Sequence, residues 1–202
     1  MNIGQVQVVR KITIGIAITL SILVFAVTNS YYPSGGRMHE LIEWVGIVLI
    51  FFCILGRTWA ALYIGGRKID HLVTIGPYSV TRNPLYFFSI VGAAGCGAQL
   101  GSVTVGFIWG ALTWICFYVV VRMEERMLTE RYKETFIDYA KSVPRFLPNP
   151  RLWRDEETLT ISPPRVLQTF ADASVFLLAI PLAEGLESLQ EIGVLPVLLQ
   201  LP

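Results

Sequence analysis

Two polar clusters interrupt a largely apolar chain, and their residue types suit the binding of charged groups. The first cluster, residues 76–86, reads GPYSVTRNPLY, and the second begins with Glu124-Glu125. Arg82 carries a guanidinium that can pair with a carboxylate or phosphate through two parallel hydrogen bonds. Adjacent side chains on a helix point about 100° apart, so one glutamate is expected to face a site and the other water. Taken singly, Arg82 is more simply a headgroup anchor and the acidic pair a solvated face.

A third polar cluster, residues 143–148, reads VPRFLP and contains a further cation, Arg145. Its two prolines make it stiff, and we expect it to fold back as a lid over residues 65–83, which connect two apolar runs. Tyr132 and Tyr139 precede this lid on one helical stripe. Together the clusters could supply carboxylates, cations and aromatic walls to a single pocket.

The composition indicates a protein embedded in lipid. Of the 202 residues, 53% are apolar and only 15% are charged, whereas soluble domains carry about 25% charged residues. The net charge of +1 implies neither a nucleic acid nor an acidic partner. Membrane lipids are therefore the expected surroundings of this chain.

Apolar runs predict an all-α integral membrane protein with about five transmembrane helices, a cytosolic helical extension, and a connector that forms the pocket. The expected helices cover residues 12–28, 44–64, 85–100, 103–121 (continuing into water as far as Val143-Pro144) and 168–188. Three parts follow, namely an N-terminal hairpin (1–64), a core (65–150) and a C-terminal tail (151–202). Glycines at 92, 95, 97 and 101 keep the third helix thin for close packing against the fourth.

Basic residues predict the orientation. Arg10 and Lys11 precede the first apolar run, and most other basic residues fall in segments on the same side. The positive-inside rule then places the N-terminus and all three polar clusters in the cytoplasm of a multi-pass protein. A signal peptide is the alternative for the first run, but no small-x-small cleavage site follows it. For Arg57, near the end of the second run, we favour a headgroup contact over an inward orientation.

The cysteines and histidines predict neither a disulfide nor a metal site. Cys53, Cys96 and Cys116 all lie within apolar runs and are expected to be small apolar fillers. His39 and His71 are too few and too far apart in the sequence to suggest a metal centre.

The combined spacing resembles a known family. The chain has, in order, Gly-x-Tyr-x-x-x-Arg-(His/Asn)-Pro-x-Tyr, a helical hairpin, Glu-Glu-x-x-Leu and Tyr-x-x-x-Val-Pro. This pattern is similar to that of the isoprenylcysteine carboxyl methyltransferases, and related phospholipid methyltransferases share much of it. The matching residues are Gly76, Tyr78, Arg82, Pro84, Tyr86, Glu124, Glu125, Leu128, Tyr139, Val143 and Pro144. Two positions depart from the pattern, with Asn83 where founding members have histidine and Phe88 where glycine is usual.

The resemblance implies an S-adenosylmethionine-dependent methyltransferase whose lipidic acceptor, most simply an isoprenylcysteine-like carboxylate, enters from the bilayer. Arg82 would orient the acceptor carboxylate, and Glu125 would hold Arg82 or the cofactor. The residues expected to bind S-adenosylmethionine are Tyr78, Asn83, Pro84, Tyr86, Glu124, Tyr132, Tyr139 and Arg145. A carboxylate acceptor is ionised at pH 7 and needs no base, whereas for an amine or thiol Glu125 is the best candidate base.

Other functions stay open at this stage. The acceptor could instead be a phospholipid amine or another lipid. A non-catalytic membrane scaffold or subunit would explain the departures at Asn83 and Phe88. A sterol-type reductase is disfavoured because residues 131–136 lack the glycine and tryptophan of that group. The oligomeric state is not indicated.

Overall fold

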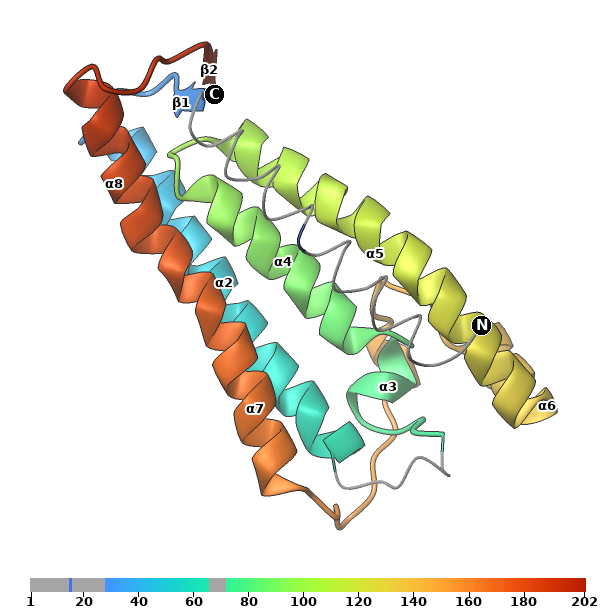
Figure 1. The fold of residues 1–202 in the computed structure, drawn as a ribbon. Coiled ribbons are helices and arrows are strands. Elements are labelled where there is room, and N and C mark those ends of the chain that lie inside the picture. Colours follow the sequence, from blue (N-terminus) through green and yellow to red (C-terminus); the bar gives the residue numbers. More distant parts are fainter. Residues whose placement is uncertain (1–14, 16–27, 66–71) are drawn as a thin grey trace.

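Long apolar helices lie side by side in the computed structural model, which describes residues 15, 28–65 and 72–202 (Figure 1). The helices are α2 (Arg37–Gly65), α4 (Pro84–Ala98), α5 (Val103–Tyr132), α7 (Pro163–Ser174) and α8 (Ala179–Glu191), with the 3-10 turn η2 (Val175–Leu178) joining the last two. Within the described residues, three stretches are long and apolar enough to cross a membrane, namely Arg37–Ile64, Val103–Tyr132 and Pro163–Glu191, and α4 is a shorter apolar helix. The mostly helical membrane fold is thus confirmed. Most of the predicted first span, 12–28, lies outside the described residues.

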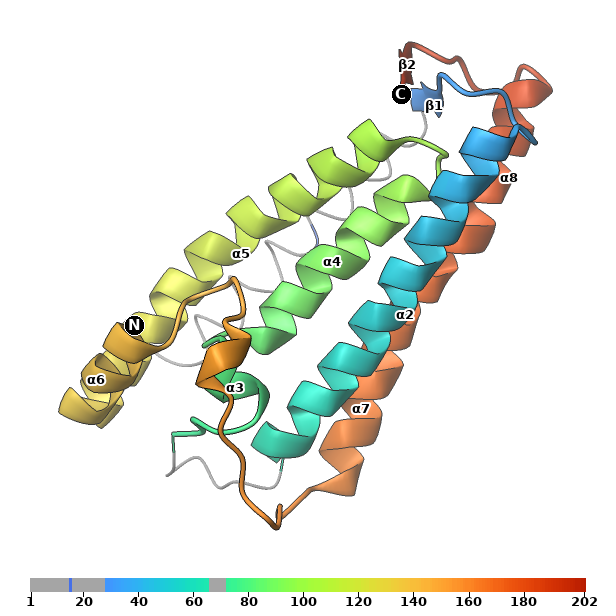
Figure 2. The same cartoon turned by 180° about the vertical axis from the view of Figure 1, so that it is seen from behind.

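Helix α4 lies between α2 and α5 (Figures 1 and 2), and its glycines explain how closely the three approach. A Cβ added to Gly97 would lie 2.8 Å from the Cα of Gly106 on α5. A Cβ added to Gly95 would lie 2.7 Å from the carbonyl oxygen of Gly46 on α2. Close packing of α4 on α5 is therefore confirmed, and the same glycine-rich helix also packs closely on α2.

The expected extension of α5 beyond the apolar run is confirmed, with a break near its end. Lys133 adopts a left-handed φ of 47° and separates α5 from α6 (Glu134–Ser142). Helix α6 buries Phe136 and Tyr139 and ends at Ser142, directly before Val143-Pro144, where the sequence predicts a stop.

The predicted C-terminal helix is present and longer than expected. Residues 163–191 run along α2 (Figures 1 and 2), where Ala173 packs with Ile50 and Ile54. Beyond it, β2 (Leu199–Leu201) pairs in parallel with β1 (Thr28–Ser30). Sequence periodicity did not predict these strands, because they are short and pair across most of the chain.

The preferred orientation of Arg57 is wrong. Its Nη1 donates to the Ser89 hydroxyl and to the Leu85 carbonyl oxygen, both on α4. The guanidinium therefore points into the protein, because α4 offers it acceptors that lipid does not.

Candidate active site

A rigid turn presents Arg82. Gly76 has a positive φ of 55°, and a Cβ there would lie 2.1 Å from the Tyr63 ring. Pro77 begins the short helix α3 (Pro77–Val80) and Pro84 begins α4, so each proline occupies the first turn of a helix. Arg82 sits in the few residues between them, where the backbone has little freedom.

The expected lid over this turn is confirmed. The amide of Arg82 donates to the Pro144 carbonyl at 2.9 Å, and the Asn149 amide donates to the Val80 carbonyl at 2.9 Å. The Asn83 side-chain amide donates to the Arg145 carbonyl at 3.1 Å. These bonds dock residues 143–149 on the connector and set the position of the Arg145 side chain.

Glu125 on α5 lies between two guanidiniums. Its Oε1 is 3.0 Å from Nε of Arg82. Its Oε2 accepts from Nε of Arg145 at 2.9 Å and lies 2.8 Å from Nη2 of the same residue. The Glu125 side chain is only 13% exposed and that of Arg82 10%, so solvent screens this pair weakly. The hydrogen bond to Glu125 is the main cause that raises the pKa of Arg145. The predicted clusters thus meet through one carboxylate.

A strongly cationic pocket of about 490 Å³ opens above this carboxylate. Its charged lining consists of five cations, Arg82, Arg122, Arg126, Lys141 and Arg145, and one carboxylate, Glu125. Thr129, Phe136, Ile137 and Ala140 complete the wall. Because positive charge exceeds negative, the pocket is suited to hold an anionic group such as a carboxylate.

Two tyrosine hydroxyls form hydrogen bonds that join neighbouring elements of the site. Tyr86 on α4 donates its hydroxyl to Oε1 of Glu124 on α5 at 2.8 Å. Tyr139 donates to the Tyr78 carbonyl at 2.6 Å, which joins α6 to α3. Burial raises the pKa of both Tyr78 and Tyr139, so both phenols are neutral at pH 7. The buried Tyr78 hydroxyl has no hydrogen-bond partner among the described residues.

The ten site residues predicted from the sequence therefore divide by location. Arg82, Glu125 and Arg145 line the pocket. The other seven lie outside this lining. Tyr86 and Glu124 form a hydrogen bond between α4 and α5, and Tyr139 donates to the Tyr78 carbonyl between α6 and α3. Tyr132 packs in an apolar cluster with Phe136 and Val143, the Asn83 side chain donates to the backbone of the lid, and Pro84 begins α4.

Three cations of the pocket were not among the predicted site residues. Arg122 and Arg126 lie on α5 close to Glu125, and Lys141 comes from α6. Helical spacing could have revealed Arg122, which precedes Glu125 by three residues on the same face. Lys141 belongs to another helix, so only the fold of α6 brings it to the pocket.

Comparison with known proteins identifies relatives. Residues 42–135 match the phospholipid methyltransferase family. The nickel-cobalt-cadmium resistance protein NccN of Alcaligenes xylosoxydans xylosoxydans is 35% identical over 158 residues, covering 78% of this chain and 74% of that protein. The cobalt-zinc-cadmium resistance protein CzcN of Cupriavidus metallidurans is 34% identical over 161 residues, covering 80% of this chain and 74% of that protein.

A more distant relative carries an enzyme name. Protein-S-isoprenylcysteine O-methyltransferase B of Arabidopsis thaliana is 24% identical over 145 residues, covering 66% of this chain and 72% of that protein. No solved structure matches the chain significantly.

Proposed function

The chain belongs to the membrane methyltransferase family that includes phospholipid methyltransferases and protein-S-isoprenylcysteine O-methyltransferases, and we propose that it transfers a methyl group from S-adenosylmethionine to the carboxylate of a lipidic acceptor. The observation that carries this proposal is the pairing of Glu125 with Arg82 and Arg145 under a cationic pocket.

This pairing favours a carboxylate acceptor over an amine. An amine or thiol must lose a proton, and among the described residues Glu125 is the only carboxylate in the lining of the pocket. Both of its oxygens already face guanidiniums, so accepting a proton would cost it those ion pairs. A carboxylate acceptor is already ionised at pH 7 and requires only orientation. In this proposal Arg82 and Arg126 orient the acceptor carboxylate.

The residues beside the pocket fit S-adenosylmethionine. When bound, this cofactor supplies an electrophilic methyl group. Its carboxylate suits Arg145 in the pocket lining, and its ammonium and ribose hydroxyls suit Glu125 and the adjacent Glu124, which accepts from Tyr86. The Tyr78 hydroxyl, buried outside this lining and unpartnered among the described residues, is a further polar group that we assign to the cofactor. Asn83, Pro84, Tyr86, Tyr132 and Tyr139 would hold these groups in place through the contacts described above.

An aromatic cluster next to Arg145 supports a lipidic acceptor. The Arg145 guanidinium lies 5.6 Å from the centre of the Tyr118 ring, and Tyr118 contacts Trp114 and Phe146. Tyr118 and Trp114 lie on the exposed apolar face of α5, within a stretch apolar enough to cross a membrane. An apolar chain could therefore lie along α5 with its carboxylate in the pocket. By the positive-inside rule, we place this pocket on the cytoplasmic side.

Methyl transfer by the detergent-purified protein tests the proposal. Radiolabelled S-adenosylmethionine is offered with S-farnesyl-N-acetylcysteine, with its methyl ester, and with phosphatidylethanolamine. We expect label only on the free carboxylate, and at least a 10-fold lower kcat/KM in Arg126→Ala. Arg165→Ala is the matched control, because Arg165 is exposed at the start of α7, outside the pocket. Label on the amine alone would refute the carboxylate acceptor, and absence of calorimetric S-adenosylmethionine binding would refute the methyltransferase.

The two relatives named for metal resistance favour a second, compatible role. We infer that the protein acts in resistance to divalent transition metals. A deletion strain should then grow less than its parent in Co²⁺, Zn²⁺ or Cd²⁺, and equal growth of both strains would argue against this role.

A further inference from the structure

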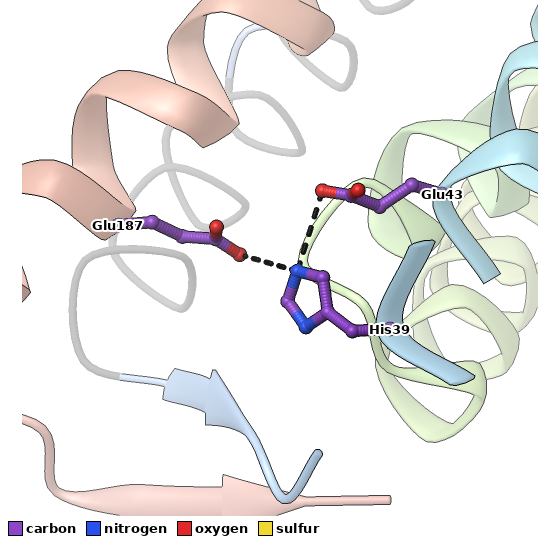
Figure 3. Close-up of side chains that lie close together, drawn as sticks. All are labelled: His39, Glu43 and Glu187. Atoms are coloured by element: carbon purple, nitrogen blue, oxygen red, sulfur yellow. Dashed lines mark ion pairs between the residues drawn. The ribbon is translucent and has the colours of Figure 1, made fainter. Parts of the chain in front are cut away.

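Three side chains with metal-ligand chemistry converge, as Figure 3 shows. They come from α2 and α8, at the end of the bundle opposite α3 and α6 (Figure 1). His39 and Glu43 lie one turn apart at the start of α2, and Glu187 reaches them from α8. The His39 Nε2 is 3.3 Å from Oε1 of Glu43 and 3.3 Å from Oε1 of Glu187. One potential ligand atom of each residue lies within 4.8 Å of those of the other two. Sequence spacing could not reveal this group, because Glu187 comes from a distant helix.

Hydrogen bonding alone satisfies this cluster poorly. One Nε2 proton can point at only one acceptor, and both separations exceed the roughly 2.7–2.9 Å of charge-assisted hydrogen bonds. His39 is only 2% exposed, so water screens the charges of this cluster weakly. The buried Oε1 of Glu187 accepts no hydrogen bond among the described residues. Two carboxylates facing one imidazole also repel each other in a weakly screened environment.

We propose that His39, Glu43 and Glu187 bind a divalent transition-metal ion of the Zn²⁺ or Co²⁺ type. In a tetrahedral site with bonds of about 2.0–2.1 Å, neighbouring ligand atoms lie about 3.3–3.4 Å apart, as both Nε2–Oε1 pairs do here. One imidazole and two carboxylates suit Zn²⁺, Co²⁺ or Ni²⁺ better than Ca²⁺ or Mg²⁺, which prefer oxygen alone. Three protein ligands leave a fourth position for water or another ligand.

The surroundings hold the imidazole in place and attract cations. Gly101, in the turn between α4 and α5, has a φ of 62°, and a Cβ there would lie 2.2 Å from Nδ1 of His39. The ring is therefore seated against a residue that must be glycine. Glu184 and Glu191 lie about one turn before and after Glu187 on α8 and add negative charge to this end of the bundle.

This site rests on side chains distant from the cationic pocket, so it does not depend on methyl transfer. The protein could bind the metal without binding S-adenosylmethionine, or the reverse, so the two proposals are tested separately.

The test is titration of chelator-treated, purified full-length protein with Zn²⁺ and with Co²⁺. We expect one equivalent per chain, visible Co²⁺ absorption bands, and a melting temperature about 5–10 °C higher at saturating Zn²⁺. Glu43→Gln and Glu187→Gln should each weaken binding at least 10-fold. Glu184→Gln is the matched control, because it removes the same charge one turn away and should change affinity less than 3-fold.

Two results would overturn the proposal. One is the absence of stoichiometric uptake by the wild-type protein. The other is equal weakening by Glu184→Gln and Glu187→Gln, which would show a general attraction of cations rather than a site. Glu43 is 28% exposed on the surface of α2, so Glu43→Gln should fold even if Glu187→Gln does not. Circular dichroism of each metal-free variant checks this.

Discussion

Replacement of Glu125 by glutamine tests whether this carboxylate organises the candidate active site. The change keeps the shape of the side chain and removes the charge that Arg82 and Arg145 share. Arg82 would then keep its bond to the Ala140 carbonyl, and Arg145 its contact with the Tyr118 ring. Both guanidiniums would lack an opposing charge while remaining largely buried.

The size of the expected loss of stability follows from how exposed the two arginines are. Removing one member of a buried ion pair costs about 3–5 kcal/mol, because the other charge is left uncompensated. The side chain of Arg82 is 10% exposed and that of Arg145 29% exposed, so solvent relieves part of this cost for Arg145. We expect Glu125→Gln to lower the free energy of unfolding by about 2–4 kcal/mol. For a chain of this size, that corresponds to a melting temperature about 5–15 °C lower.

The assay is tryptophan fluorescence during thermal unfolding in detergent, at one scan rate for all variants. Glu130→Gln is the matched control, because Glu130 is exposed on the same helix and should change stability by less than about 0.5 kcal/mol. In a double-mutant cycle, Arg82→Met should recover about 1–2 kcal/mol of the loss, since it removes the unpaired charge. Equal melting of Glu125→Gln and Glu130→Gln, or strict additivity in the cycle, would refute the reasoning.

Three further substitutions, the first with a control variant, probe the scaffold. Gly97→Leu should lower the free energy of unfolding by about 1–3 kcal/mol or more, measured by thermal unfolding, because its Cβ would lie 2.8 Å from the Gly106 backbone. Gly185→Ala is the control and should be neutral or stabilising, because a Cβ there has nothing within 4 Å. Tyr139→Phe should cost about 1 kcal/mol at pH 7 for the lost hydrogen bond. Burial raises the pKa of Tyr139, so the unfolded chain loses its phenolic proton at a lower pH than the folded protein does, and stability falls above about pH 10. Tyr139→Phe should therefore reduce this fall of stability at alkaline pH, measured as the melting temperature against pH. Ser102→Ala should cost about 1 kcal/mol of unfolding free energy by removing the cap of α5, and an unchanged melting curve would contradict this.

The helices and the polar clusters were predictable because their signals are local. Apolar runs predict helices over 44–64, 103–121 and 168–188, since the backbone of a segment in lipid must satisfy its hydrogen bonds internally. The structure has longer helical stretches that include these runs, at 37–65, 103–132 and 163–191. Prolines at 77 and 84 begin helices because of their fixed φ. The spacing of Arg82 and Glu125 around a helical hairpin was enough to expect that they lie on one side of the bundle.

Only the tertiary structure decided which groups meet. Arg145 reaches Glu125 because residues 143–149 dock on the connector, and Arg57 turns inward because α4 offers acceptors to it. The pairing of β1 with β2 and the approach of Glu187 to His39 join segments from opposite ends of the chain. Such contacts depend on loop closure and on the summed packing of several helices, so no local periodicity encodes them. The sequence alone therefore determined the helices and the chemistry they carry, and the packing of the helices determined which side chains share a site.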